Sequence, residues 1–382
     1  MTRVADPNRL PGLDLLRAVA IVWVLVCHAN GFGLLPSDYF GWMGVDLFFV
    51  LSGFLIGGQL FRPIARGGRP DYGNFLARRL LRTLPAYLAV LALYLAFPVL
   101  RDRASIQPAW QFLTFTQNLL IDPSKANTFS QAWSLCVEEQ FYLLLPLVIV
   151  AFGARATPKR TLALLVAMLA FGVALRAGLW LRFVARPPFG LTAAPGSGAY
   201  MRYIYYPTWT RLDGLLAGVS LALVRAFRPR LWSTIVARPN LLLAAGLLGV
   251  AASILFFGKQ IAGFWASAAG FPLLAASMAA LVAAGRDPRS MIGRAALPGA
   301  GALAAASYGL YLSHKMAYRA VIRLMQDAAL QAHGSTLALA IGAALVVGAA
   351  LYLLIERPFL RLRDRFRSPA PPASLGVALA AE

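Results

Sequence analysis

Two polar side chains in the first apolar segment are the strongest candidates for chemistry. Arg17 and His28 are eleven positions apart, which at about 100° per residue brings them to nearly the same helix face. At ~1.5 Å rise per residue they lie roughly 16 Å apart along that face. An imidazole can take a proton from a hydroxyl near neutral pH, so His28 is a candidate general base. A histidine hydrogen-bonded between helices is the structural alternative.

Carboxylates in two other apolar segments could act with this histidine. Asp46 could pair with Arg17 or orient His28, as a carboxylate fixes the imidazole tautomer in a catalytic triad. Glu138 and Glu139 in WSLCVEEQFY are about 100° apart on a helix, so only one of them can face a given site. Such a carboxylate could pair with an arginine or, if burial favours its neutral form, transfer protons.

The other polar positions suggest binding and support. Arg79 and Arg82 are three apart and share a helix face, where forked donors suit a polyphosphate and lipid headgroup contact is the alternative. Ser52 and Gly53 form a small patch where either a helix or a ligand can approach. In the TRLDG motif, charge neutralisation across helices is expected of Arg211 and Asp213. The SYGLYLSHKMAY motif is expected to form one polar stripe on a helix, from Ser307, Tyr311, His314 and Tyr318.

The elements that carry these residues are predicted to be membrane-spanning helices. The 382 residues are 59% hydrophobic and 13% charged, whereas soluble domains have about 25% charged residues. The net charge of +21 comes from short clusters between apolar runs, which the positive-inside rule explains better than a nucleic-acid partner does. The two cysteines lack metal-ligand spacing, so no metal site and no disulfide framework are indicated.

The fold class is therefore all-α, a multi-pass protein of a bacterial-type inner membrane. About ten spans are expected, at 13–33, 42–61, 84–100, 132–152, 161–182, 207–225, 239–257, 263–284, 300–323 and 335–356. The distribution of Lys and Arg predicts that both termini are cytoplasmic. We divide the chain into an N-terminal cytoplasmic segment, a membrane domain and a basic, then disordered, cytoplasmic tail, at 1–12, 13–360 and 361–382.

Seven motifs in order resemble the membrane-bound acyltransferase 3 family: LDLLRAVA with its histidine, FFVLSGF, RRLLRTLP, WSLCVEEQFY, RLDG, SYGLYLSH and ERPF, over about residues 10–360. The resemblance implies a ten-helix domain that moves acyl groups, most often acetyl, to hydroxyls of extracytoplasmic or lipid-linked glycans. The family's functional positions map onto Arg17, His28, Arg79, Arg82, Glu138 and His314.

The sequence departs from the family pattern in three ways. Leu15 replaces the glycine that usually follows Asp14, and Lys315 replaces a bulky apolar residue after His314. The esterase-like extracytoplasmic domain that is fused in some relatives is not seen, which leaves room for a separate transferase to finish the reaction.

The residues and the resemblance together give one mechanistic hypothesis. Cytoplasmic acyl-CoA, with acetyl-CoA as the expected donor, would place its phosphates at Arg17, Arg79 and Arg82 and its thioester beside His28. His28 would deprotonate the acceptor hydroxyl, oriented by the carboxylate of Asp46 or Glu138, and a covalent acyl-histidine is the variant. A secondary transporter or exporter of a small polar or glycolipid substrate is the alternative function.

The acceptor is expected to be a glycan or a lipid-linked glycan, reached in contact with membrane lipid. Loops 101–131 and 183–206 are the longest predicted extracytoplasmic segments and are rich in aromatic side chains. These side chains could stack on sugars or form an interfacial belt. The sequence leaves the acyl chain length, the acceptor and the oligomeric state open.

Overall fold

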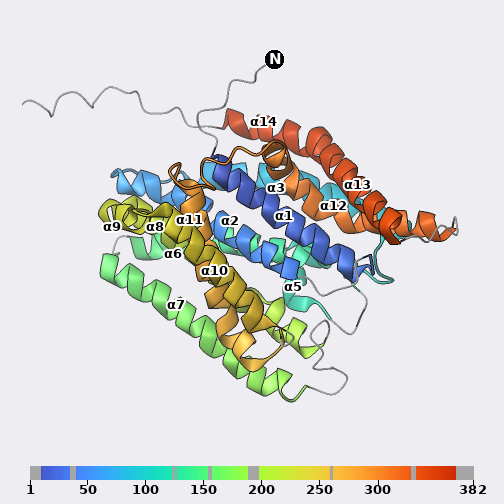
Figure 1. Cartoon of the computed structure of the whole chain (residues 1–382), viewed down its shortest axis with the longest axis horizontal. Coiled ribbons are helices and arrows are strands. Elements are labelled where there is room, and N and C mark those ends of the chain that lie inside the picture. The colour runs from blue at the N-terminus through green and yellow to red at the C-terminus, as the bar shows by residue number, and fades with distance from the viewer. Residues whose placement is uncertain are drawn as a thin grey trace, which may run out of the picture.

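The computed structural model describes residues 10–34, 40–122, 125, 127–153, 157–187, 198–258, 261–327 and 333–366. Within these ranges the regular elements are helices (Figure 1), with one isolated bridge between Ser105 and Asn127. The all-α prediction is confirmed for this part of the chain. The predicted N-terminal segment, except 10–12, and the predicted disordered tail from 367 onward lie outside the described residues.

The α-helices are α1 Pro11–Gly31, α2 Met43–Ala65, α3 Tyr72–Ala96, α4 Ala109–Leu113, α5 Gln117–Leu120, α6 Ala132–Gly153, α7 Pro158–Leu179, α8 Asp213–Phe227, α9 Pro229–Ile235, α10 Pro239–Phe257, α11 Phe271–Arg286, α12 Ala300–Asp327, α13 His333–Leu351 and α14 Arg357–Arg365. Short 3₁₀ turns are Phe40–Trp42, Pro98–Leu100 and Thr208–Thr210. The π-helical turns are Trp180–Val184, Met201–Tyr205, Ala266–Gly270 and Tyr352–Glu356.

Among the described residues, eight helical segments are long and apolar enough to cross a membrane, by length and composition. Two of the ten expected spans are not among them. The helix α8 has 15 residues, fewer than the roughly 20 that a straight crossing needs. The helix α12 has 28 residues, but its serine, tyrosine, histidine and lysine side chains lower its hydropathy. The number of ten spans and the cytoplasmic termini therefore stay predictions.

Local sequence signals explain where several helices begin. The carboxylate of Asp71 accepts a hydrogen bond from the backbone N–H of Asn74 and so caps α3. The hydroxyl of Thr157 does the same for α7, and the proline that follows it has no N–H to leave unpaired. The Asp71 cap fixes the start of α3, and α3 carries two of the candidate arginines.

The helices α1 and α2 lie in the middle of the bundle (Figure 1). The helices α12 and α13 lie on one side of them, and α8, α10 and α11 lie on the other. The two residues of the Ser52–Gly53 patch face different neighbours, and helix packing is the predicted role that the structure shows. Gly53 packs against the backbone of Leu215 in α8, whereas Ser52 faces the carboxylate of Glu138 in α6.

The contact between α2 and α8 depends on glycines, and this can be tested. A Cβ at Gly218 would clash with the backbone of Val50 and Phe54, whereas a Cβ at Gly342 in α13 would meet nothing within 4 Å. Gly218→Ala is expected to lower the free energy of unfolding by about 1–3 kcal/mol through overpacking. Gly342→Ala, the matched control, is expected to raise it by about 0.5–1 kcal/mol. Thermal unfolding in detergent measures both, and equal melting temperatures would contradict the tight crossing.

Candidate functional site

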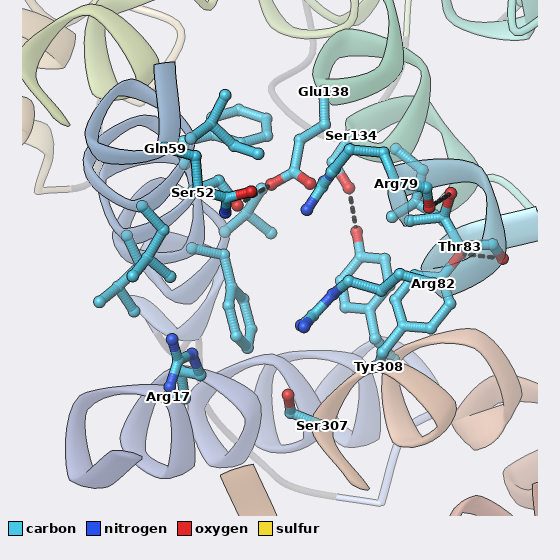
Figure 2. A pocket seen from close by; sticks show the side chains of 18 of the residues that line it. Arg17, Ser52, Gln59, Arg79, Arg82, Thr83, Ser134, Glu138, Ser307 and Tyr308 are labelled. Atoms are coloured by element: carbon cyan, nitrogen blue, oxygen red, sulfur yellow. Dashed lines mark hydrogen bonds between the residues drawn. The ribbon is translucent and has the colours of Figure 1, made fainter. Parts of the chain in front are cut away.

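A cavity of about 560 Å³ opens among α1, α2, α3, α6, α12 and α14 (Figure 2). This volume lies within the range of small-molecule sites. Its lining contains five arginines and one carboxylate, which are Arg17, Arg78, Arg79, Arg82, Arg363 and Glu138. The excess of guanidinium groups favours an anionic ligand with several charges.

The predicted arginine cluster is confirmed as a structural feature. Arg79 and Arg82 lie on one face of α3 and line the cavity together with Arg17 of α1, as Figure 2 shows. The guanidinium of Arg79 lies 3.8 Å above the ring of Tyr142, and its buried Nε has no hydrogen-bond partner among the described residues. Arg17 Nη1 donates to Asp14 Oδ1 over 2.8 Å. Asp14 thus holds Arg17 at the cavity wall.

Glu138 faces the cavity, as expected for the first of the two adjacent glutamates. Its Oε1 accepts from Ser52 Oγ over 2.9 Å, and its Oε2 accepts from the Tyr142 hydroxyl over 2.7 Å. Both oxygens are therefore held by hydroxyl groups of α2 and α6. The structure does not support the predicted contact of Glu138 with His28.

His28 and His314 form a pair with ring centroids 4.8 Å apart. His314 is fully buried, whereas His28, in the last turn of α1, is half-buried. Nδ1 of His28 lies 3.0 Å from the Val24 carbonyl oxygen, and Nδ1 of His314 lies 3.0 Å from the Leu310 carbonyl oxygen. A carbonyl oxygen can only accept, so each Nδ1 must carry the proton of its hydrogen bond. In the neutral rings, each Nε2 then keeps a lone pair that can accept a proton.

The buried Nε2 of His314 has no partner among the described residues. Unsatisfied buried acceptors are rare because they cost free energy, and those that persist call for a functional explanation. The pair therefore offers a hydroxyl group an acceptor that the protein itself leaves open. Backbone carbonyls, rather than a carboxylate, orient both rings.

The cavity does not reach this pair, which corrects the expected continuous path from Arg17 to His28. The cavity lining includes Ser134, which Figure 2 labels, and Tyr311, and their hydroxyl oxygens are 2.6 Å apart. The Tyr311 hydroxyl also lies 3.0 Å from the carbonyl oxygen of Gln131. The ring of Tyr311 lies 6.1 Å from that of His314. One tyrosine thus separates the arginine cavity from the histidines.

The rest of the predicted stripe on α12 shares one face of the helix. Ser307 lines the cavity with Tyr311, and the ring of Tyr318 lies 5.8 Å from that of His314. The Tyr318 hydroxyl donates to the carbonyl oxygen of Leu25 in α1 over 3.0 Å. The stripe therefore packs along α1, from the cavity past the histidine pair.

Asp46 is not placed as predicted. Both of its oxygens accept from Nη2 of Arg211, at 2.9 and 3.0 Å, and the pair is buried. Asp46 therefore neither pairs with Arg17 nor orients His28. The physical reason is the cost of the buried Arg211 guanidinium, which lies among aromatic rings and needs a carboxylate to offset its charge.

Asp213 forms the second buried ion pair. Its carboxylate, on α8, accepts hydrogen bonds from Nη1 and Nη2 of Arg176, on α7, over 2.7 and 3.1 Å. The expected neutralisation of Arg211 and Asp213 across helices is confirmed, each with a partner on another helix. The sequence did not identify Arg176 as the partner of Asp213, because the two are far apart along the chain.

Sequence reasoning also missed a polar cluster beside His314. Nζ of the buried Lys315 donates to Ser130 Oγ over 2.8 Å and lies 4.0 Å from Asp102 Oδ2. The signal was present, since Lys315 was noted as a departure from the family pattern. Within the described part of the chain, no group of three or more His, Cys, Asp or Glu residues could hold a metal ion.

Comparison with known proteins adds independent evidence. Residues 10–355 match the family profile described as "Acyltransferase domain". The O-acetyltransferase OatA of Staphylococcus aureus (strain NCTC 8325 / PS 47) is 32% identical over 238 residues, which cover 59% of this chain and 36% of that protein. The peptidoglycan O-acetyltransferase OatA of Listeria monocytogenes serovar 1/2a is 30% identical over 263 residues, which cover 65% of this chain and 39% of that protein.

The matched region is thus less than two fifths of the length of these relatives. No solved structure matches the chain. The two relatives are acetyltransferases by name, which argues against the transporter alternative.

Proposed function

Because this chain belongs to the membrane-bound acyltransferase 3 family, we propose that it transfers an acyl group from acyl-CoA to a hydroxyl of a glycan or glycolipid. Acetyl-CoA at the cytoplasmic membrane surface is the proposed donor. Peptidoglycan is the first acceptor to test, since the Listeria relative is named for it. The observation that carries the proposal is an arginine-lined cavity near a pair of histidines, of which His314 has a buried Nε2 without a partner among the described residues.

The donor side of the proposal rests on charge and geometry. Coenzyme A carries a pyrophosphate and a 3′-phosphate, and planar guanidinium forks bind phosphate oxygens in pairs. Arg17, Arg79 and Arg82 line one cavity, and the Arg79 Nε is buried without a partner. A bound phosphate would supply the acceptor atom that the Arg79 Nε lacks. The apolar lining from α2 would then face the pantetheine arm.

The chemistry is assigned to the histidine pair. His28 Nε2 takes the proton of the acceptor hydroxyl while the hydroxyl oxygen attacks the thioester carbonyl carbon. The carbon–sulfur bond then breaks, and the coenzyme A thiolate leaves and takes the proton back from the imidazolium. Nothing is oxidised or reduced. Positioned general base catalysis of this kind contributes about 10²–10⁴ in rate.

Tyr311 must move for the thioester to reach His28. Its hydroxyl would exchange the hydrogen bond to Ser134 for water or a substrate group, which costs little because hydrogen bonds are exchanged rather than lost. We assign Tyr311 to positioning the donor, and Glu138 with Ser52 to shaping the cavity wall. A covalent acyl-histidine remains the competing pathway.

A direct assay tests the proposed function. Protein purified in detergent is incubated with radiolabelled acetyl-CoA, with and without peptidoglycan fragments that carry free hydroxyls. We expect release of the coenzyme A thiol that depends on the acceptor, with label in the glycan. The proposal would be contradicted if the protein bound acetyl-CoA but no hydroxyl-bearing glycan caused release of the coenzyme A thiol.

The arginine cavity gives the first mutational prediction. Arg79→Ala combined with Arg82→Ala is expected to raise the KM for acetyl-CoA by at least about tenfold, because charge-assisted hydrogen bonds are worth ~1.5–3 kcal/mol each. The KM for the acceptor should stay the same. Steady-state kinetics at saturating acceptor measures both constants.

Arg289→Ala is the matched control, since this exposed arginine pairs with Asp287 away from the cavity. It should leave the KM for acetyl-CoA unchanged. Arg79→Lys with Arg82→Lys keeps both charges but loses the fork, so an intermediate KM is expected. A double alanine variant with wild-type KM would remove these residues from the donor site.

A further inference from the structure

A second cavity, of about 580 Å³, is lined by four arginines at the other end of the bundle. Arg101 and Arg103 come from the segment after α3, and Arg319 and Arg323 come from the second half of α12. Along α12, Arg319 lies about 18 Å beyond Ser307, which lines the first cavity. The two arginine cavities therefore open toward opposite ends of the bundle.

The positive charge of this second cavity is not neutralised within the described part of the chain. Arg101 donates to the carbonyl oxygens of Tyr94 and Leu95, and Arg323 donates to the carbonyl oxygen of Val99. Backbone carbonyls hold these two arginines in place and leave each of them with its full charge. Among the described residues, no ion pair to a carboxylate is found for any of the four arginines.

Asp102, the one acid among the described lining residues, does not change this balance. Its carboxylate lies 4.0 Å from Lys315, a buried cation outside the lining, so its charge is already compensated. The Nε of Arg319 is buried and has no partner in the described structure. A buried donor without an acceptor costs free energy, so an acceptor from outside the protein would be stabilised here.

Topology gives no other reason for the cluster. The distribution of Lys and Arg predicts that this end of the bundle is extracytoplasmic, where the positive-inside rule disfavours basic residues. Four arginines around one cavity on that side are therefore not explained as topology signals. Guanidinium groups converging on one space are suited to bind phosphate or carboxylate.

The position of this cavity along α12 connects it to the histidine pair. Lys315, Arg319 and Arg323 follow the i, i+4, i+8 pattern, which places them on one side of the helix. Lys315 is adjacent to His314, and Arg319 is about 6 Å further along the axis. Along α12 the second cavity therefore lies close to His314, whose Nε2 is buried without a partner among the described residues.

We propose that this second cavity binds an anionic group of the acceptor, a phosphate or a carboxylate, so that a neighbouring hydroxyl reaches the histidine pair from the side opposite to the acyl donor. This inference rests on the proposed acyl transfer and adds a substrate class, because it makes the preferred acceptor an acidic glycan. A neutral glycan would reach the same histidines without this anchor.

The test compares two double variants. Arg103→Gln with Arg319→Gln removes two charges from the cavity, at arginines whose side chains make no hydrogen bond that the structure records. Arg228→Gln with Arg230→Gln, the control, removes two charges from exposed arginines at the start of α9, outside the lining of both arginine cavities. Each variant is assayed with a carboxylate-bearing peptidoglycan glycan fragment and with a neutral N-acetylglucosamine oligomer.

We expect the cavity variant to raise the KM for the acidic fragment by about tenfold or more, with the KM for the neutral oligomer and for acetyl-CoA unchanged. The control variant should leave all three constants unchanged. If the cavity variant raises the KM for the acidic fragment and the KM for the neutral oligomer equally, or raises neither of them, the proposal is overturned.

A binding arm needs no turnover, so it separates this proposal from the proposed function. Thermal shift of the wild-type protein with the acidic fragment should exceed that with the neutral oligomer, and the difference should vanish in the cavity variant. The same measurement in nanodiscs of phosphatidylcholine or phosphatidylglycerol distinguishes a glycan anion from a lipid headgroup. The cavity would be assigned to lipid, and the proposal overturned, by two results together. The acidic fragment would give no thermal shift in phosphatidylglycerol nanodiscs, and in phosphatidylcholine nanodiscs the acidic and neutral glycans would give equal shifts.

Discussion

Replacing His28 with alanine is expected to lower kcat/KM for acetyl transfer by about 10²–10⁴, because the hydroxyl then loses the base that takes its proton. Acceptor-dependent thiol release, measured with the purified variant, reports this directly. The KM for acetyl-CoA should change little, because the arginine cavity ends before the histidine pair. Melting temperature and yield should stay close to wild type, because the ring makes one hydrogen bond to its own helix.

His314→Ala is the informative comparison. This ring also bonds to its own helix, through Leu310, and packs against His28. If His28 is the base, removal of His314 should reduce the rate less and shift the pH profile, since it changes the surroundings of the remaining imidazole. Wild-type activity of His28→Ala would eliminate the assignment. Label on the wild-type protein that forms from acetyl-CoA without acceptor, is released by neutral hydroxylamine and is absent in His28→Ala would favour the acyl-histidine pathway.

Asp46→Ala is expected to lower the free energy of unfolding by about 3–5 kcal/mol, because it leaves the Arg211 guanidinium buried without a counter-charge. Thermal unfolding and detergent-extracted yield measure this loss. An aspartate that orients a catalytic histidine would give the opposite result, a stable protein with a low kcat. The two roles of Asp46 are therefore distinguished in one experiment.

The double variant Asp46→Asn with Arg211→Met completes the test. Replacing both partners removes the buried charges together, so much of the lost stability should return. Asp287→Asn is the control, because its partner Arg289 is exposed and such pairs contribute about 0–1 kcal/mol. A double variant as unstable as Asp46→Ala alone would show that the ion pair is not the source of the effect.

The sequence predicted those features that depend on spacing within one helix. Arg79 and Arg82 share a face of α3, and the polar stripe of α12 lies on one side, because a helical period fixes both. The family pattern maps onto Glu138 rather than Glu139, and in the structure Glu138 is the one of the two that lines the cavity.

Contacts between distant segments could not be predicted in the same way. Asp46 and Arg211 are 165 positions apart, and helical periodicity says which face a residue occupies but not which helix lies opposite. Asp46 was assigned to the wrong partners for this reason. The orientation of His28 was missed for another reason, since a backbone carbonyl of the same helix leaves no signal in the sequence.

The bond between Tyr311 and Ser134 has a consequence for the membrane itself. An enzyme that accepts a donor on one face and an acceptor on the other risks becoming a proton leak, and the histidine pair is suited to relay protons. In this structure the lining of the arginine cavity includes Tyr311 but neither histidine. On the proposed function, Tyr311 would keep the resting protein from leaking protons, and the displacement of Tyr311 by the donor would open that barrier.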